Sequence, residues 1–445
     1  MKKQFAFLFF LMFTVPVIAQ KKTDHKETAK TILTLLNNNE YSKAVSYFDT
    51  SYAKRLTPER LEKTWTSVIK LVGAYKKTTD ITVNSQPGTA IVLQKCEFEK
   101  RSMNLRMSFN SKEKIINFSI LPDSPKDKYE LPAYYDSTKV EELEVKITNG
   151  TFKLPGTLTM PKTGSKFPVV VFVHGSGSND RDESVGASKV FKDMALGLAM
   201  KGVASLRYEK RTKVYGGRLM QNKKINTVKE ETIDDVIAAV HSLGNYSSID
   251  TNRVFLIGHG LGGMLLPRIA QQLPGLSGLF IMGASGGRLE DVFYNESVYL
   301  LALDSMTSKK EAYLDTLKRQ AAKVKLITPA SANDTTVDNR LLGFPKTYWI
   351  DLSTYNQLKT AKKLGLPVYI LQAERDYQVS MNDFELWKKE LSQNRNVHFK
   401  SYPKLNHLFI EGQGKGSPAE YDKRGNVASY VLDDLKNWID AAKDK

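Results

Sequence analysis

The stretch Val254-Phe255-Leu256-Ile257-Gly258-His259-Gly260-Leu261-Gly262-Gly263 decides the fold, because it predicts a buried strand that turns sharply into a helix. Four apolar residues form the strand, and four glycines fall within the next six positions. Glycine permits such a turn, since it tolerates positive φ and close backbone contact. Two kinds of site use this geometry: the dinucleotide-binding pattern G-x-G-x-x-G, and the elbow G-x-S-x-G that presents a catalytic nucleophile.

The dinucleotide alternative depends on Gly258, Gly260 and Gly263, which match G-x-G-x-x-G. That pattern normally occupies the first βαβ unit of a domain and is followed about 20 residues later by an acidic residue. Here several predicted strands precede the glycines, and residues 276–287 contain no acidic residue. The sequence therefore favours the nucleophile elbow, with Gly260 at the position where a serine is expected.

The other parts of a hydrolytic site follow in a consistent order. His174-Gly175-Ser176-Gly177 lies at the end of an apolar strand and suits an oxyanion loop. Asp376 follows the predicted strand Pro367–Gln372, and His407 follows the predicted strand Val397–Tyr402. Elbow, acid and histidine succeed one another in this order in α/β-hydrolases.

The pattern of strands and helices predicts two domains. From residue 136 to residue 445 strands alternate with helices, which predicts an α/β-hydrolase fold with a mainly parallel sheet flanked by helices. Residues 288–354 interrupt this alternation with charged, helical sequence and are expected to form a helical lid insertion. Residues 20–135 predict a small α+β domain, and the proline-containing residues 122–136 read as a linker.

The N-terminus has the pattern of a secretory signal peptide. Lys2 and Lys3 precede the apolar run Phe5–Phe13, and Val17-Ile18-Ala19 resembles a small-residue cleavage site. We therefore expect residues 1–19 to be removed near Ala19 and the mature protein to be exported, periplasmic or extracellular. No later stretch reaches the roughly 20 apolar residues that a membrane span requires.

Composition excludes several function classes. The chain of 445 residues contains 65 Lys+Arg and 48 Asp+Glu, a formal net charge of +17, but the basic residues are not clustered as in a nucleic-acid-binding protein. The single cysteine, Cys96, excludes an internal disulfide framework, and the six histidines lack metal-ligand spacing. We expect no metal and no nucleic-acid partner.

From about Glu141 to its C-terminus, the chain resembles the secreted bacterial carboxylesterase family of the α/β-hydrolase superfamily, whose members often carry an N-terminal accessory domain of unknown function. The matching stretches are HGSGSNDRDE from His174, LRYEKRTKVYG from Leu206, GHGLGGMLLPRIA from Gly258, PKTYWIDL from Pro345, ERDYQV from Glu374, DFELWKK from Asp383 and LNHLF from Leu405.

The resemblance implies a carboxylic ester hydrolase of the Ser-His-Asp class that needs no cofactor and acts on a small-molecule ester. It implies that Asp376 orients His407, which is the general base, and that the backbone N–H groups of Ser176 and Leu261 form the oxyanion hole. The nucleophile position falls on Gly260, which has no side chain.

This departure leaves three explanations open, because no acyl-enzyme can form without a nucleophile. The chain is a ligand-binding pseudoenzyme, a substituted variant of an active esterase, or a weak hydrolase in which His407 activates water. Ser176, Ser178 and Ser285 are candidate substitute nucleophiles, although roles in turns are favoured for them.

Four further residues are candidates for substrate binding: Gly175 and Gly177 in the oxyanion loop, His259 beside the elbow, and Arg211 after a strand end. For His259 the alternative is a packed neighbour. For Arg211 it is an ion-pair network, with Asp180, Asp182 and Glu183 as the available carboxylates. Tyr348 and Trp349 either line the lid or pack beneath it. The sequence does not specify the ester or the oligomeric state.

Overall fold

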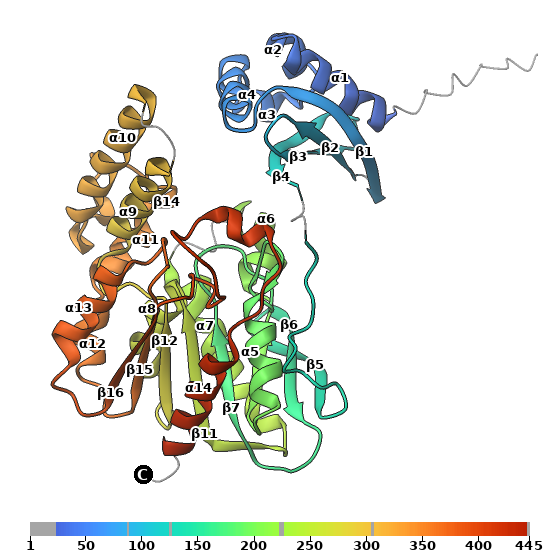
Figure 1. Ribbon diagram of the computed structural model, residues 1–445. Coiled ribbons are helices and arrows are strands. Elements are labelled where there is room, and N and C mark those ends of the chain that lie inside the picture. The colour runs from blue at the N-terminus through green and yellow to red at the C-terminus, as the bar shows by residue number, and fades with distance from the viewer. Residues whose placement is uncertain (1–23, 87–88, 124–126, 222–226, 304–306, 443–445) are drawn as a thin grey trace, which may run out of the picture. The chain divides into compact units, whose positions relative to one another are not determined.

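A computed structural model describes residues 24–86, 89–123, 127–221, 227–303 and 307–442 (Figure 1). The chain divides into two compact units, Met1–Ser124 and Pro125–Lys445. This division lies within the expected linker, ahead of the boundary expected after residue 135. The reason is that Tyr129 and Tyr134 belong to the second unit: their hydroxyls donate to Asp193 Oδ1 (2.8 Å) and to the Val427 carbonyl (3.1 Å). The predicted signal peptide, residues 1–19, lies outside the described residues.

The N-terminal unit consists of helices followed by an antiparallel meander, as the sequence predicts. Two of its longer helices begin at side-chain caps: Asp24 accepts from the Lys26 N–H, and Thr57, which precedes Pro58, accepts from the Arg60 N–H. The sheet order is β1-β2-β3-β4. The elements are α1 (His25–Asn37), α2 (Tyr41–Val45), α3 (Thr50–Ala53), α4 (Pro58–Val72), β1 (Tyr75–Gln86), β2 (Thr89–Phe98), β3 (Ser102–Asn110) and β4 (Ile115–Pro122).

Strand β2 shows how this unit forms its core. Its residues alternate between buried and partly exposed, which is the period of a strand with one covered face. Cys96 is one of the buried residues, and burial raises the pKa of its thiol to about 11. The thiol therefore stays protonated and packs as a small apolar group.

The second unit is built on an eight-stranded sheet in the order β16-β15-β12-β11-β7-β10-β6-β5. In this spatial order, the neighbouring strands from β16 through β7 to β10 are parallel to one another. Strand β6 is antiparallel to both β10 and β5. The strands are β5 (Val140–Asn149), β6 (Phe152–Pro161), β7 (Phe167–Val173), β10 (Ala204–Tyr208), β11 (Ile249–His259), β12 (Gly278–Met282), β15 (Val368–Ala373) and β16 (Val397–Tyr402). This is the mainly parallel, helix-covered sheet that the sequence predicts.

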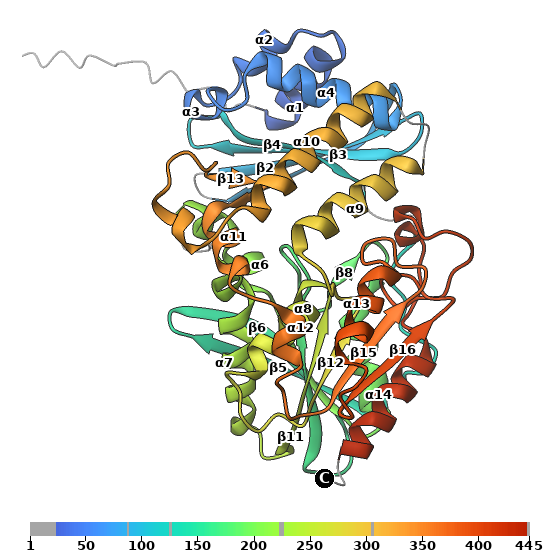
Figure 2. The ribbon, with the colours of Figure 1, turned by 90° about the vertical axis from the view of Figure 1, so that its left-hand side faces the viewer.

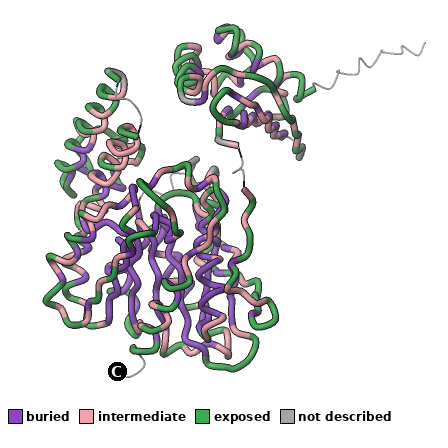
Figure 3. Tube along the Cα trace, viewed as in Figure 1, coloured by how far each residue is buried: buried purple, intermediate pink, exposed green. Residues whose placement is uncertain are grey.

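Two apolar cores lie on opposite faces of this sheet. In β7, Val169 and Val171 belong to one core, whereas Val170 and Phe172 belong to the other, so the strand is buried on both faces (Figure 3). One face is covered by α5 (Val190–Ala199) and α14 (Ser429–Ala441). The other is covered by α7 (Asp234–Ser242), α8 (Leu261–Ala270) and α13 (Met381–Leu391).

Helices of the expected lid insertion occupy the segment between β12 and β15 and stand at the upper end of the sheet (Figure 2). They are α9 (Leu289–Ala302), α10 (Ser308–Lys325) and α11 (Lys346–Ser353), with the short pair β13 (Arg340–Leu341) and β14 (Phe344–Pro345), and α12 (Gln357–Ala361) after them. Among the described helices, none combines the length and apolar character needed to cross a membrane.

Candidate active site

The turn between β11 and α8 consists of Gly260 alone, with φ +54° and ψ −119°. Residues with a side chain rarely adopt this conformation, so the backbone favours glycine. Nearby, Gly262 permits α8 to approach β7 closely, because a Cβ there would lie 2.2 Å from the Val173 carbonyl oxygen. This contact fixes the turn against the neighbouring strand.

The space around Gly260 itself is open. Among the residues that the structure describes, a Cβ at this position would meet only Gly175 Cα at 3.8 Å and His407 Nε2 at 3.9 Å, which are ordinary van der Waals distances. Sterically, Gly262 must be glycine, whereas position 260 has room for a side chain directed at the histidine.

Asp376 and His407 form a buried pair at the carboxyl ends of β15 and β16. His407 Nδ1 donates to Asp376 Oδ2 over 2.6 Å, and each residue is 7% exposed. The other carboxylate oxygen accepts the backbone N–H groups of Gln378 (2.8 Å) and Val379 (2.9 Å), which fixes the acid. Because Nδ1 carries the proton, Nε2 of a neutral ring has a free lone pair, and this nitrogen faces Gly260.

The loop after β7 supplies backbone donors on the other side of Gly260. The Gly175 N–H donates to Glu183 Oε1 (2.8 Å). In the described part of the chain, the N–H groups of Ser176 and Leu261 donate to no protein acceptor, and both residues line the same cavity. Two free N–H groups, one of them at the start of helix α8, are suited to bind a negatively charged oxygen.

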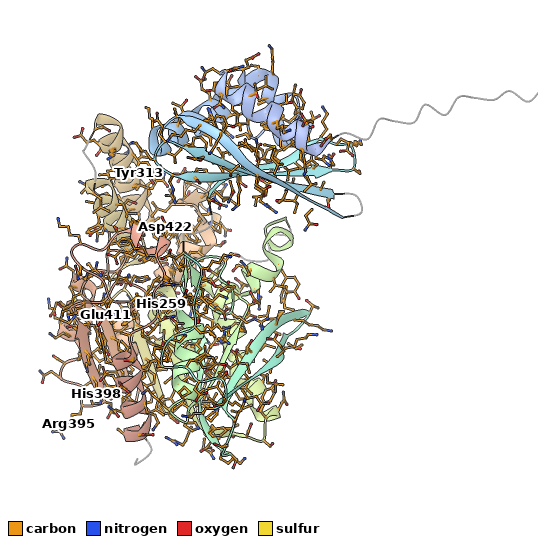
Figure 4. The ribbon with its side chains drawn as sticks, turned by 45° about the vertical axis from the view of Figure 1, so that its right-hand side comes forward. His259, Tyr313, Arg395, His398, Glu411 and Asp422 are labelled. Carbon is orange, nitrogen blue, oxygen red and sulfur yellow. The ribbon has the colours of Figure 1, made fainter. Side chains whose placement is uncertain are left out.

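A second buried histidine lies beside the first. His259 Nδ1 is 3.1 Å from Glu183 Oε2, and its Nε2 is 2.9 Å from the His407 carbonyl oxygen. Both partners only accept hydrogen bonds, so His259 carries a proton on each nitrogen. Burial alone would lower the pKa of His259, but the Glu183 carboxylate outweighs it and raises this pKa. Figure 4 shows His259 inside the unit near the upper end of the sheet, far from His398 at the lower end.

His174, which opens the oxyanion loop, is a packing residue. Its ring lies 5.1 Å from that of Phe191 and 5.3 Å from that of Tyr208, between ring centroids. Burial lowers the pKa of His174 to about 4, so the imidazole is neutral at physiological pH.

These groups surround a cavity of about 190 Å³. Its lining is largely apolar and includes helix α9 of the insertion, which contributes Leu289, Val292, Phe293 and Glu296. Burial raises the pKa of Glu296 to about 7, with a further contribution from the negative charge of Asp376. The described residues contain no group of three or more His, Cys, Asp or Glu side chains arranged to hold a metal. A small, largely apolar molecule with one polar group fits this lining.

Arg211 is not brought to this cavity. Its Nε donates to Asp235 Oδ2 over 3.0 Å, and its guanidinium lies 4.3 Å from the centre of the Phe152 ring. The expected ion pair is therefore present, but its partner is Asp235 instead of the nearby acids 180, 182 or 183. Of the four residues predicted to bind substrate, Gly175 and His259 line the cavity, whereas Arg211 and Gly177 do not.

Ser285, one of the candidate substitute nucleophiles, is engaged in hydrogen bonds, and the two aromatic residues of the insertion are buried. Ser285 lines the cavity, but its hydroxyl donates to Asp383 Oδ1 (2.6 Å) and accepts the Gly287 N–H (2.9 Å). Tyr348 and Trp349 are almost fully buried and lie outside the described cavity lining, where Trp349 donates to the Leu341 carbonyl (2.9 Å).

Two carboxylates of the site, Glu183 and Glu296, are not predicted as site residues from the sequence. Glu183 lies within the HGSGSNDRDE stretch, directly after Asp182, and its position in that motif was the available signal. Glu296 lies on a helix of the insertion, and nothing in its local sequence connects it with the distant Asp376 or His407.

The family of the chain follows from its similarity to known proteins. The chain is 33% identical over 408 residues to Esterase EstD of Thermotoga maritima, which covers 91% of this chain and 92% of that protein. The chain belongs to the α/β-hydrolase esterase family. Within the chain, residues 329–441 match the dienelactone hydrolase family model, and residues 29–118 match a family described as a protein of unknown function, DUF3887.

Two of the solved structures that resemble the chain are esterases. One is Est1E from Butyrivibrio proteoclasticus, at 15% identity and TM-score 0.43, covering 68% of this chain and 99% of that one. Another is an esterase from Pyrococcus furiosus, at 17% identity and TM-score 0.42, covering 71% of this chain and 98% of that one.

Proposed function

We propose that this member of the esterase family is an exported carboxylic ester hydrolase for small-molecule esters, whose chemistry is impaired by Gly260. Asp376 orients His407, and His407 is the general base. The N–H groups of Ser176 and Leu261 stabilise the negative oxygen of the tetrahedral intermediate. The observation that carries the proposal is the 3.9 Å between His407 Nε2 and a Cβ at Gly260, because a serine hydroxyl lies one bond beyond that Cβ.

With glycine at position 260, the remaining groups support only weak hydrolysis. A water molecule next to His407 is then the nucleophile, and the free N–H groups stabilise the developing charge. Enzymes that lack one member of the triad retain roughly 10³–10⁴-fold catalysis over water from the oxyanion hole and binding alone.

The test is to restore the hydroxyl. In assays with p-nitrophenyl butyrate, Gly260→Ser is expected to raise kcat/KM by about 10³-fold or more. Gly260→Ala is the matched control, because it introduces the same Cβ and the same backbone strain without the hydroxyl. Equal activities of the serine and alanine variants would show that position 260 is not the nucleophile position.

A binding-only protein is the second candidate function, and the absence of a side chain at Gly260 favours it. Such a protein would use the same cavity for a ligand and would not turn it over. Slow hydrolysis by the parent chain that disappears in His407→Ala would exclude this candidate. Parent and His407→Ala proteins with the same background rate would support it.

Export is supported by Lys2, Lys3 and the apolar run that follows them. We expect the mature protein outside the cytoplasm, with its N-terminus near residue 20. Fractionation of expressing cells and N-terminal sequencing of the recovered protein test this. Full-length protein in the cytoplasm would contradict it.

A further inference from the structure

A buried lysine lies directly behind the oxyanion loop. Lys210 Nζ donates to the Gly175 carbonyl oxygen over 2.8 Å and to Glu231 Oε1 over 2.6 Å. Lys210 is 2% exposed and Glu231 is 5% exposed. Buried ion pairs often contribute little net stability, since removing both charges from water is costly. The placement of this pair on one particular carbonyl therefore points to a role other than stability.

That carbonyl belongs to the peptide bond whose N–H is free in the cavity. The Gly175 C=O and the Ser176 N–H are joined by one planar amide, so whatever fixes the oxygen also fixes the direction of the N–H. An ammonium group on the oxygen draws electron density through the amide. Hydrogen bonds linked in this way strengthen one another, so the Ser176 N–H becomes a better donor.

The surrounding chain holds this arrangement from both sides. Glu231 lies in the π-helical turn Lys229–Ile233, and such turns are rare and frequently found at functional sites. On the other side, Glu183 accepts the Gly175 N–H from a left-handed backbone conformation, φ +48°. Charged groups therefore hold both peptide planes that meet at Gly175, and the neutral side-chain amide of Asn179 also donates to the Gly175 carbonyl, over 3.1 Å.

We propose that Lys210, held by Glu231, is a positioning residue of the oxyanion hole: it orients and polarises the Gly175–Ser176 peptide so that the Ser176 N–H binds the negative oxygen of the tetrahedral intermediate. The inference rests on the oxyanion hole assigned under the proposed function. Lys210 itself does not line the cavity described above, so it acts through the peptide and not on the substrate.

The first experiment uses the chain as it stands, with Gly260 in place. Butylphosphonate is the probe, because its tetrahedral anion resembles the intermediate, and calorimetry gives its Kd. Lys210→Met is expected to weaken binding about 10-fold, while binding of neutral butyramide changes less than twofold. Lys346→Met is the matched control, because Lys346 is also a buried lysine that donates to a carbonyl, that of Asp334 (2.9 Å), away from the cavity.

The double variant Lys210→Met/Glu231→Gln distinguishes positioning of the peptide by Lys210 from electrostatic attraction between Lys210 and the anionic probe. It also reduces the risk of misfolding, since it leaves neither partner of the ion pair buried and unpaired. The net local charge then equals that of the parent. The proposal requires the 10-fold loss to persist. Recovery of parental affinity, an equal loss in Lys346→Met, or a parent that does not bind butylphosphonate would each overturn it.

The second experiment measures ester hydrolysis in the Gly260→Ser background. Adding Lys210→Met is expected to lower kcat by about 10–100-fold with KM within twofold, less than the 10²–10³ that follows loss of a direct oxyanion donor. Unchanged kcat would overturn the inference and leave the proposed function standing. An inactive Gly260→Ser protein whose phosphonate binding still depends on Lys210 would overturn the proposed function and support the inference.

Discussion

The site contains two buried histidine–carboxylate pairs side by side, with the ring centroids of His407 and His259 only 4.3 Å apart. His407 bonds to Asp376 over 2.6 Å, and His259 lies 3.1 Å from Glu183. The pairs differ in the surroundings of the second ring nitrogen, Nε2. That of His407 faces Gly260, whereas that of His259 donates to the His407 carbonyl. A general base needs a free nitrogen, so only the first pair is placed to accept a proton from a nucleophile.

The second pair has a mechanical role instead. Glu183 holds the oxyanion loop through the Gly175 N–H, and His259 connects the elbow with the loop that carries His407. The Glu183–His259 pair therefore connects the oxyanion loop, the elbow and the loop that carries His407. A histidine–carboxylate pair therefore serves as a general base or holds neighbouring segments together, according to where the second ring nitrogen points.

The largest expected effect is on the first pair. In the Gly260→Ser background, His407→Gln is expected to lower kcat/KM by about 10³–10⁴-fold, because the serine loses its base. The fold should persist, since Asp376 keeps its bonds from the Gln378 and Val379 N–H groups. Steady-state kinetics with p-nitrophenyl butyrate and circular dichroism measure the two quantities. A loss below 10-fold would remove the distinction between the pairs.

The order of elbow, acid and histidine made the first pair predictable, because each residue follows a strand whose apolar pattern is visible in the sequence. The second pair was not predictable, since Glu183 and His259 meet only after the sheet has formed and no local period connects them. The same reason explains Arg211, whose partner Asp235 lies on a helix that the sequence predicts without its orientation. The spacing of apolar residues predicts the helices and strands, but which distant side chains pair depends on how those helices and strands pack.

An intermediate effect is expected on the second pair. His259→Gln should lower the free energy of unfolding by about 1–3 kcal/mol, because the buried Glu183 loses its charged partner. In the Gly260→Ser background, the same substitution should lower kcat by about 10-fold at most. The loss should depend on pH. The raised pKa of His259 contributes stability that is fully present below its unfolded pKa of about 6.5 and is lost as pH rises through the folded value.

Urea unfolding of parent and variant at pH 6 and pH 9 tests this sign. The difference between them should be larger at pH 6, because the lowered pKa of Glu183 keeps that carboxylate ionised there as well. An equal difference at both pH values would show that His259 packs as a neutral ring. A loss of activity as large as that of His407→Gln would show instead that the second pair takes part in proton transfer.

The smallest expected effect concerns Glu296, a carboxyl group that faces the same cavity and that, in the described part of the chain, is paired with no histidine. Its pKa, raised by burial to about 7 from the ordinary 4.5, means that between these values the folded protein holds a proton that the unfolded chain releases. Stability conferred by the neutral form is therefore lost as pH rises toward 7. Glu296→Gln should raise Tm by about 2–3 °C at pH 8 and by less than about 1 °C at pH 5. The exposed Glu311→Gln on α10 is the matched control and should change Tm at neither pH. Equal changes in Tm for Glu296→Gln at both pH values would show that the pKa of Glu296 in the folded protein is not raised, which would contradict this prediction.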